Sequence, residues 1–381
     1  MKFFHLSDLH IGKHLHYYNL KEDQQHILKE VIDYAESIKP DAIVIAGDIY
    51  DKSVPSAEAV TIFDEFLTAL AKLAIPVLMI AGNHDSAERL DYASQILGSH
   101  NIFIVGRPPE VEDEYIKKIV LKDEYGEVDF YLLPFLKPGY VRNIFEEKPE
   151  NYSDAVKKII EREQIDWTRR NVLVSHQFYI GNGETPSICD SENISVGGID
   201  QVDISSVKNF DYVALGHLHG AQKVSIPQIR YSGTLLKYSV SESAQEKILH
   251  IVTLEEKEKD VVVEKLPLHP LRDVRKIRGN LAEVIENALP ENKTDYVSIT
   301  LTDEVEPYKP KEQLEKVYTH ILEIRMDNTR TRKMLEDFQE EITVSDPLRV
   351  FSDFYKEMQG KEMSKEEHTV IARMIEDISD M

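Results

Sequence analysis

Residues 42–51 read AIVIAGDIYD, an apolar run that ends in a glycine and two acidic residues. The run from Ala42 to Ala46 has the length and the β-branched content of a buried strand, and Gly47 ends it. Asp48 and Asp51 therefore stand just beyond the carboxyl end of a strand. In α/β proteins, this is the end at which ligands bind.

Four other segments repeat this arrangement of an apolar run followed by side chains that commonly bind metals. The runs occupy residues 3–6, 77–80, 172–174 and 212–215, and the residues that follow them are Asp8, His10, Asn83, His84, Asp85, His176, His217 and His219. A single block means little, because Asp and Asn are common in turns and helix caps. Five blocks in series predict that distant parts of the chain meet in one shared site.

Helical periodicity separates the first three strands. Residues 22–38 place apolar side chains at helical spacing, residues 56–70 do the same with Ser56 as the predicted N-cap, and residues 87–97 follow the third block. Alternating strands and helices predict a parallel sheet with helices packed outside it.

The pattern changes after residue 105. Short strands are predicted at residues 116–121 and 128–133, a helix at 153–164, and three antiparallel strands closing a second sheet at 228–231, 247–254 and 260–266. Residues 180–200 are rich in Gly, Ser, Asn and Asp and indicate a long loop. Loops of this length in compact domains are often functional.

Pro267 and Pro270 mark a domain boundary, so we predict one domain at residues 1–270, a small α+β domain at 271–343 and a helical tail at 344–381. Within the small domain, the patterns predict strands at residues 274–277, 295–302 and 324–326 and helices at 281–289 and 311–322.

The tail begins with a helix that carries an apolar stripe of Phe351, Phe354, Tyr355 and Met358. A second helix, residues 364–378, opens with a serine followed three residues later by a glutamate, which is the capping-box spacing. Too few residues remain to bury the stripe within the tail. It is either a docking surface for a partner or a face that packs on the protein's own body.

Composition sets the outer limits. The 381 residues are 42% hydrophobic and 30% charged, and no apolar run approaches the roughly 20 residues of a membrane helix. Cys189 is the only cysteine, so we expect a soluble protein of the reducing cytoplasm, without an internal disulfide. The net charge of −23 argues against a simple nucleic-acid binder. It leaves room for a nuclease that a basic partner assists.

The chemistry of phosphate esters explains why these residue types matter. Hydrolysis needs charge neutralisation and an activated water, and two cations about 3.5–4 Å apart supply both. A carboxylate must bridge such ions, and Asp48 is centrally placed for this. In an extended chain, residues two apart point the same way, so Asp8 can bind an ion together with His10. Imidazole beside carboxylate and carboxamide favours manganese, iron or zinc over calcium or magnesium.

The blocks D-x-H, G-D-x-x-D, G-N-H-D, a lone His after a strand and G-H-x-H form a signature, and in it the chain resembles the calcineurin-like metallophosphoesterases. More narrowly, residues 5–13, 46–51, 212–219 and 231–234 resemble the SbcD family of bacterial nucleases. This resemblance extends over essentially the whole length. It implies an α/β fold, a two-sheet β-sandwich flanked by helices, with a small α+β capping domain and C-terminal helices.

The resemblance also implies roles for individual residues. One manganese ion is expected on Asp8, His10, Asp48 and His219, and a second on Asp48, Asn83, His176 and His217, although other divalent metals would fit. His84 is the expected catalytic imidazole and Asp85 the carboxylate that orients it. Some archaeal and eukaryotic relatives have a further histidine shortly after the G-D motif. Asp51 and Lys52 occupy that region here, so no catalytic histidine is assigned to it.

The function implied is a manganese-dependent DNA nuclease, with 3′-to-5′ exonuclease and endonuclease activity, that processes double-strand breaks and hairpins with the SMC-like ATPase SbcC. The tail stripe would then dock on SbcC, and the helices at residues 56–70 and 87–97 would form a homodimer within a heterotetramer. Two alternatives remain open. One is a two-metal phosphoesterase acting on nucleotides or phosphoproteins, and the other is an inactive scaffold for an ATPase partner.

Overall fold

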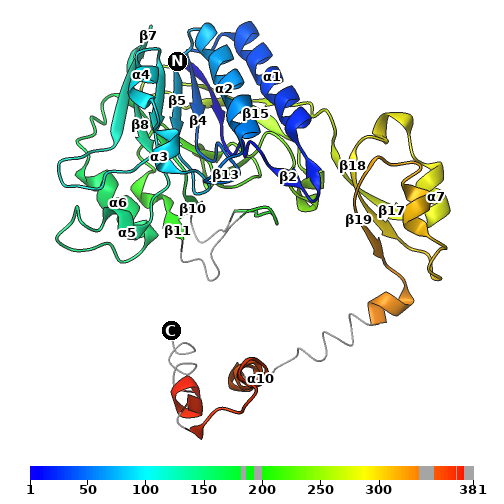
Figure 1. Cartoon of the computed structure of the whole chain (residues 1–381). Helices are drawn as coiled ribbons and strands as arrows, with labels where there is room; N and C mark the ends of the chain where they lie inside the picture. Colours follow the sequence, from blue (N-terminus) through cyan, green and yellow to red (C-terminus); the bar gives the residue numbers. More distant parts are fainter. Residues whose placement is uncertain (182–185, 193–199, 334–346, 366, 373–381) are drawn as a thin grey trace. The chain divides into compact units, whose positions relative to one another are not determined.

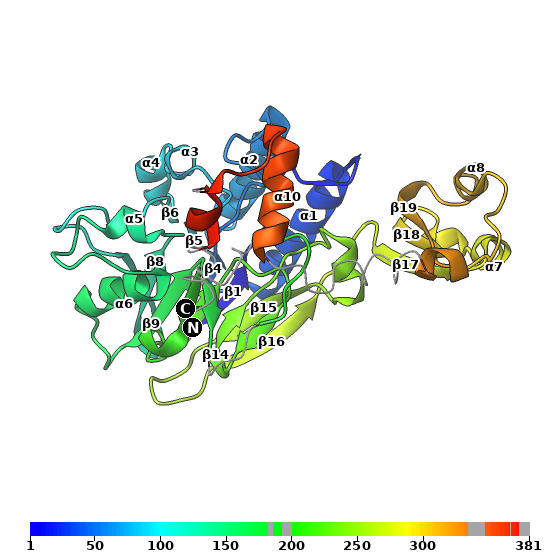
Figure 2. The same ribbon diagram turned by 90° about the horizontal axis from the view of Figure 1, so that it is seen from below.

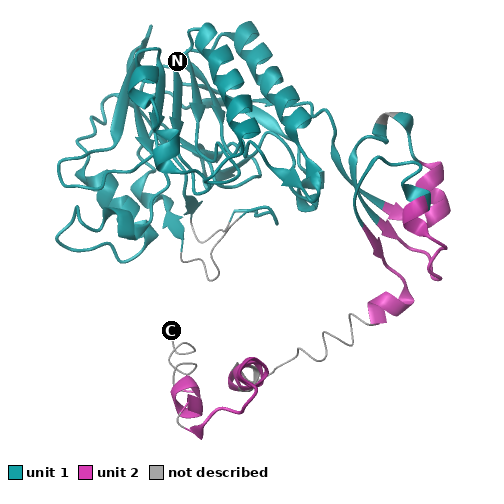
Figure 3. Cartoon of the chain, in the orientation of Figure 1, with its two compact units in different colours: residues 1–277, 288–299, 313–323 teal, residues 278–287, 300–312, 324–381 magenta. Residues whose placement is uncertain are grey.

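The computed structural model describes residues 1–181, 186–192, 200–333, 347–365 and 367–372. The chain divides into two compact units, which Figure 3 colours separately: residues 1–277, 288–299 and 313–323, and residues 278–287, 300–312 and 324–381. The domain boundaries expected after residues 270 and 343 stay predictions. Among the described residues, no helix combines the length and the apolar character that crossing a membrane requires.

The first sheet has six strands in the order β16-β15-β1-β4-β5-β6. Their bounds are β1 Lys2–Leu6, β4 Ala42–Ile45, β5 Val77–Ile80, β6 Ile102–Val105, β15 Ile248–Thr253 and β16 Val262–Pro267. Strands β1, β4, β5 and β6 run parallel, whereas β15 is antiparallel to both β1 and β16. Both faces of the central strands are covered, which explains why β4 and β5 are apolar throughout.

Helices α1 (Lys21–Ile38) and α2 (Ala57–Lys72) lie side by side on the outer face of this sheet (Figures 1 and 2). As predicted, α2 begins after Ser56, whose hydroxyl accepts a hydrogen bond from the Ala59 N–H at 3.1 Å. Phe63, Phe66 and Leu70 form the buried stripe of α2 and join the core on that face. Apolar packing of this stripe holds the helix against the strands.

The second sheet has the order β13-β14-β12-β9-β8-β7. Its strands are β7 Lys117–Asp123, β8 Gly126–Leu133, β9 Arg170–Ser175, β12 Tyr212–Leu215, β13 Gln222–Val224 and β14 Ile226–Tyr231. Helix α6 (Tyr152–Arg162) packs on its outer face through Ala155 and Ile159. Between the sheets, the ring of Phe3 lies 5.4 Å from that of Phe130 and 5.8 Å from that of Tyr212. The expected two-sheet sandwich is confirmed.

Two predictions about this sandwich were wrong. The strands near residues 247–254 and 260–266 belong to the first sheet as β15 and β16, and β14 pairs in parallel with β12. Local sequence cannot reveal these pairings, because β15 pairs with β1 across about two thirds of the chain, Lys2 lying opposite Thr253. The helix predicted at residues 87–97 is two short helices, α3 (Ala87–Leu90) and α4 (Ser94–Gly98). Ala93 separates them at a positive φ of 60°, and the Asp91 carboxylate accepts a hydrogen bond from the Gly106 N–H at 2.7 Å.

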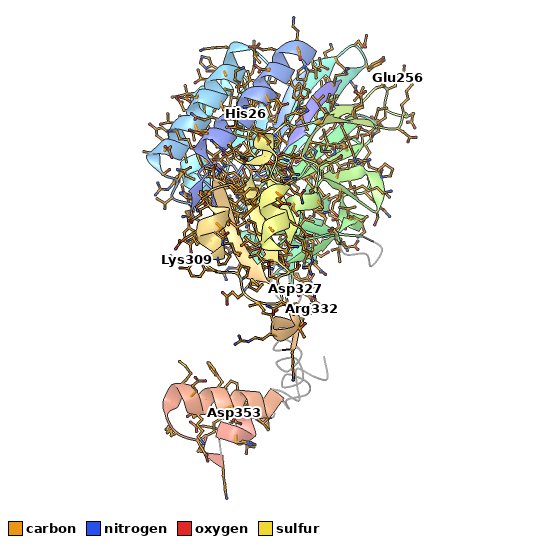
Figure 4. All side chains as sticks on the ribbon, turned by 90° about the vertical axis from the view of Figure 1, so that its right-hand side faces the viewer. His26, Glu256, Lys309, Asp327, Arg332 and Asp353 are labelled. Carbon is orange, nitrogen blue, oxygen red and sulfur yellow. The ribbon has the colours of Figure 1, made fainter. Side chains whose placement is uncertain are left out.

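Strands β17 (Val274–Gly279), β18 (Tyr296–Leu301) and β19 (His320–Met326) form a three-stranded sheet. Helix α7 (Leu281–Glu286) begins with a capping box on Asn280. The helix predicted at residues 311–322 is wrong beyond α8 (Pro310–Leu314), because residues 320–326 pair as a strand instead. In the second unit, Asp327 pairs with Arg278 and accepts a hydrogen bond from Arg332 at 2.7 Å (Figure 4).

The tail contains the predicted first helix as α10 (Pro347–Gln359). The predicted capping box is also present: the Ser364 N–H donates to the Glu367 carboxylate at 2.8 Å, and the Glu367 N–H donates to the Ser364 hydroxyl at 3.2 Å. The helix predicted at residues 364–378 lies partly outside the described residues.

Candidate metal centre

All five sequence blocks meet where the two sheets bring their strand ends together. The first sheet contributes Asp8 and His10 after β1, Asp48 after β4, and Asn83 after β5. The second sheet contributes His176 after β9 and His217 and His219 after β12. Both sets of strands are parallel and end at the same edge, so loops far apart in the sequence face one another.

The backbone at this edge is held in an uncommon conformation. Asp8, His10 and Asp48 have φ values of 53°, 43° and 51°. Non-glycine residues adopt such left-handed conformations at a cost on the order of 1–3 kcal/mol each, and they concentrate at functional sites. Hydrogen bonds between the loops maintain them: the Asp8 N–H donates to the Gly47 carbonyl at 2.9 Å and the His10 N–H to the Asp48 carbonyl at 3.0 Å.

Two glycines permit the sheets to approach this closely. A Cβ on Gly47 would collide with the ring of His176, and a Cβ on Gly216 would collide with the carbonyl oxygen of Ala46. Both glycines belong to the sequence blocks, which explains why each of these blocks pairs a glycine with a ligand-type residue.

A first group of donors consists of Asp8, His10 and His219, whose ligand atoms lie within 4.8 Å of one another. The two imidazole Nε2 atoms are 3.2 Å apart. Nδ1 of His219 is engaged by the Ser191 hydroxyl at 2.7 Å. This hydrogen bond at Nδ1 leaves Nε2 of His219 directed at the shared site.

A second group surrounds Asn83. Its side-chain oxygen lies 3.0 Å from Nε2 of His176 and 2.9 Å from Nδ1 of His217. Asp48 lies between the two groups, because its Oδ2 is 3.4 Å from Nε2 of His176 and 3.7 Å from Nε2 of His10. Asp48 therefore has the position that a bridging carboxylate requires.

These distances suit divalent metal ions. Ligand bonds of about 2.0–2.2 Å place neighbouring donors about 3 Å apart, which is the spacing found in both groups. The donors are imidazoles, carboxylates and one carboxamide, a set that transition metals accept. The residues thus fit two ions, and their roles as ligands remain a proposal.

Burial and mutual charge shift the ionisation of the group. Burial raises the pKa of Asp8 to about 7, and it lowers the pKa of His217 to about 3. Burial alone would raise the pKa of Asp48 and lower that of His176. Their mutual attraction outweighs it, so the pKa of Asp48 falls well below its usual value and that of His176 rises to about 9. Metal ions compete with protons for such ligands, so occupancy is expected to rise with pH.

His84 is at the edge of the site, with its ring 4.8 Å from that of His10. His84 and Asp85, which is predicted to orient it, both form hydrogen bonds with the backbone of residues 49–51. The Asp51 carbonyl engages Nδ1 of His84 at 2.8 Å. The Asp85 carboxylate instead accepts backbone hydrogen bonds from Ile49, Tyr50 and Gly82 at 2.9–3.0 Å. Asp85 therefore holds the loops that carry Asp48 and His84, and its role in orienting His84 stays a prediction.

The hydrogen bonds that hold His219 in place were not predicted from the sequence. The Ser191 hydroxyl donates to the Glu242 carboxylate at 2.6 Å, and the buried Lys247 ammonium donates to the same carboxylate at 2.6 Å. Glu192 accepts a hydrogen bond from the His219 N–H at 2.6 Å. The sequence indicated them only through the polar composition of residues 180–200, and the described part of this loop contains Ser191 and Glu192.

The predicted partner-binding residues lie on α10. The side chains of Phe351, Phe354 and Met358 are 36%, 57% and 66% exposed. Tyr355 is half-buried, and its hydroxyl donates to the Glu367 carboxylate at 2.8 Å. Their role in binding a partner remains a proposal.

Two family models match the chain. A calcineurin-like phosphoesterase model matches residues 1–221, which is more than half of the length. A model described as the type 5 capsule protein repressor C-terminal domain matches residues 270–359.

Individual proteins match over the full length. The SbcD component of the nuclease SbcCD from Staphylococcus epidermidis is 34% identical over 391 residues, spanning 100% of this chain and 99% of that protein. The protein of the same name from Staphylococcus saprophyticus is 30% identical over 380 residues, spanning 98% of each. A solved dimetal phosphatase from Danio rerio aligns with a TM-score of 0.40 at 13% identity, covering 70% of this chain and 95% of that one.

Proposed function

We infer the activity from the premise that the chain belongs to the calcineurin-like phosphoesterase family and, within it, to the SbcD nucleases. It is a metal-dependent phosphodiesterase that cuts DNA. The observation that carries this conclusion is the convergence of seven donor side chains from two sheets, with Asp48 between the two groups.

We propose manganese as the ion at both positions, one on Asp8, His10, Asp48 and His219 and one on Asp48, Asn83, His176 and His217. The mixed nitrogen and oxygen donor set supports this choice over calcium or magnesium. Bound there, two divalent cations supply charge neutralisation at the phosphoryl oxygens and activation of the attacking water.

The protein's own side chains do the remaining work. Because the Asp51 carbonyl accepts a hydrogen from Nδ1 of His84, the proton that this ring gains and loses is the one on Nε2. We propose that His84 gives this proton to the leaving oxygen. Asp85 fixes the loops around it through three backbone hydrogen bonds.

The finer assignments are also proposals. We propose 3′-to-5′ exonuclease and endonuclease activity on DNA, in complex with SbcC in the cytoplasm, with residues 271–343 as the capping domain. The exposed stripe of α10 supports docking on SbcC. A homodimer through α2, α3 and α4 is supported by exposed apolar side chains at Val60, Tyr92 and Ile96, which are 44%, 82% and 67% exposed.

The test is cleavage of linear and hairpin DNA by the purified full chain with Mn²⁺, with and without SbcC. We expect Asp48→Ala and His84→Ala to lose cleavage, whereas the control His26→Ala, on the exposed side of α1, keeps it. No DNA cleavage by the wild type under either condition refutes the nuclease assignment. Cleavage that survives in His84→Ala refutes the role given to that residue.

A further inference from the structure

A cavity of about 210 Å³ opens beside the second group of donors. Asn83 and His217 line it, so whatever occupies it lies next to the predicted second ion. Sites for drug-sized ligands are roughly 300–1,000 Å³. This cavity therefore suits a single small ring system and excludes a double-helical segment.

Aromatic side chains from three separate elements form its walls. Phe135 follows β8, Tyr152 begins α6, and Phe178 begins β10 (Phe178–Ile180). The ring of Phe178 lies 6.2 Å from that of His217, and the ring of Phe135 lies 6.4 Å from that of His176. Aromatic walls of this kind bind nucleobases by stacking, whatever the base.

The charges of the lining residues favour a base over a phosphate as the group that occupies the cavity. Asp200 lines the cavity and is 8% exposed, so its carboxylate disfavours a phosphate there and favours the amino groups of a base. Lys137 is exposed and forms no ion pair with any residue that the structure describes. It also lines a second cavity of about 410 Å³, which shares Asn83 and Phe135 with the first.

We propose that the first cavity holds the base of one nucleotide adjacent to the bond that is cut, with Lys137 contacting the phosphate of that nucleotide. This inference rests on the proposed nuclease function and specifies its substrate. A stacked and paired base cannot enter, so the nucleotide must leave the helix before cleavage. The preferred substrates are therefore DNA ends and sites where that nucleotide is unpaired or easily unpaired.

The experiment pairs a protein change with a matching substrate change. Single-stranded oligonucleotides carry an abasic tetrahydrofuran residue at one position, scanned across both sides of the cleaved bond. We expect Phe135→Ala to lower kcat/KM about tenfold on the intact strand, as loss of one stacking partner does. On the strand that lacks the adjacent base, the same variant should lower kcat/KM less than about twofold, because the stacking partner is already absent.

Equal losses on both strands overturn the proposal, since a purely structural role of Phe135 affects every substrate alike. Unchanged Mn²⁺ affinity and denaturation midpoint confirm that Phe135→Ala is folded. If it is not, Tyr152→Ala takes its place in the same comparison. A wild type that cleaves neither DNA nor bis(4-nitrophenyl) phosphate refutes the nuclease assignment itself, which is a separate outcome.

The proposed phosphate contact of Lys137 is tested separately, through the salt dependence of KM. We expect Lys137→Ala to reduce the slope of log KM against log salt concentration by about 0.7, the share of one phosphate contact in a single strand. Lys137→Arg should retain the slope, and so should the control Lys148→Ala, an exposed lysine that lines neither cavity. A wild-type slope in Lys137→Ala overturns the phosphate contact.

Discussion

Replacement of Glu242 by glutamine removes one negative charge from the group of residues that holds His219 in place. The size and shape of the side chain at position 242 stay nearly the same. Glu242 is fully buried and accepts hydrogen bonds from Ser191 and Lys247, each at 2.6 Å, and its carboxylate lies 3.6 Å from Nδ1 of His219. In Glu242→Gln, the ammonium of Lys247 stays buried without its counter-charge. Two separate effects follow, one on stability and one on metal binding.

The stability effect is large. Removal of one partner from a buried ion pair costs about 3–5 kcal/mol. Glutamine keeps an acceptor oxygen for Lys247, so we expect the free energy of unfolding to fall by about 3 kcal/mol, near the lower end of this range. Urea denaturation followed by circular dichroism measures it. The double variant Glu242→Gln, Lys247→Met removes both charges and should recover most of this loss.

The effect on metal binding is expected to behave differently. Loss of the hydrogen-bond partners of a metal-binding histidine typically lowers metal affinity about 10–100-fold, and we expect a loss in this range for Mn²⁺ by titration calorimetry. The double variant should not recover it, because Ser191 and His219 still face a neutral amide. Wild-type Mn²⁺ affinity in Glu242→Gln refutes the positioning role, and a double variant as unstable as the single one refutes the ion-pair argument.

Three further predictions concern other parts of the chain. Gly47→Ala should lower Mn²⁺ affinity at least about tenfold, because the added methyl group collides with the ring of His176. Gly139→Ala is the control, since nothing lies within 4 Å of the added Cβ there. Equal Mn²⁺ affinities of the two variants would contradict this prediction. Burial alone would raise the pKa of Asp123, but Arg170 and the Met1 amino group lower it below its usual 3.8. The wild type should therefore lose stability relative to Asp123→Asn as the pH falls below about 4, measured by urea midpoints; parallel profiles would exclude this. The double variant Phe351→Ala, Phe354→Ala should weaken SbcC binding in a pull-down and leave Mn²⁺ affinity intact, whereas wild-type capture of SbcC would refute the docking surface.

The elements that form the site were predictable because each block carries a local signal. An apolar run, a glycine and a donor side chain at a strand end identify Asp48, Asn83 and His217 without knowledge of their neighbours. The shared edge followed from the parallel arrangement, which alternating strands and helices indicate.

The errors arose where distant contacts decide the outcome. Strand β15 joined the first sheet because β1 offers it an open edge, and that pairing has no trace in the sequence around residue 250. Residues 320–326 form a strand through pairing in the three-stranded sheet, although the preceding residues have helical periodicity. The hydrogen bonds of Ser191 and Lys247 to Glu242 likewise join two distant segments, around residue 191 and at residues 242–247, that no local motif connects.

The division of the donors between two sheets has a mechanical consequence. Asp8, His10, Asp48 and Asn83 follow strands of one sheet, and His176, His217 and His219 follow strands of the other. Ions bound as proposed, by donors of both sets, would link the two sheets. Loading the protein with metal should therefore slow amide exchange in β4 and β12 together, and any force that parts the sheets should release metal and activity at the same moment.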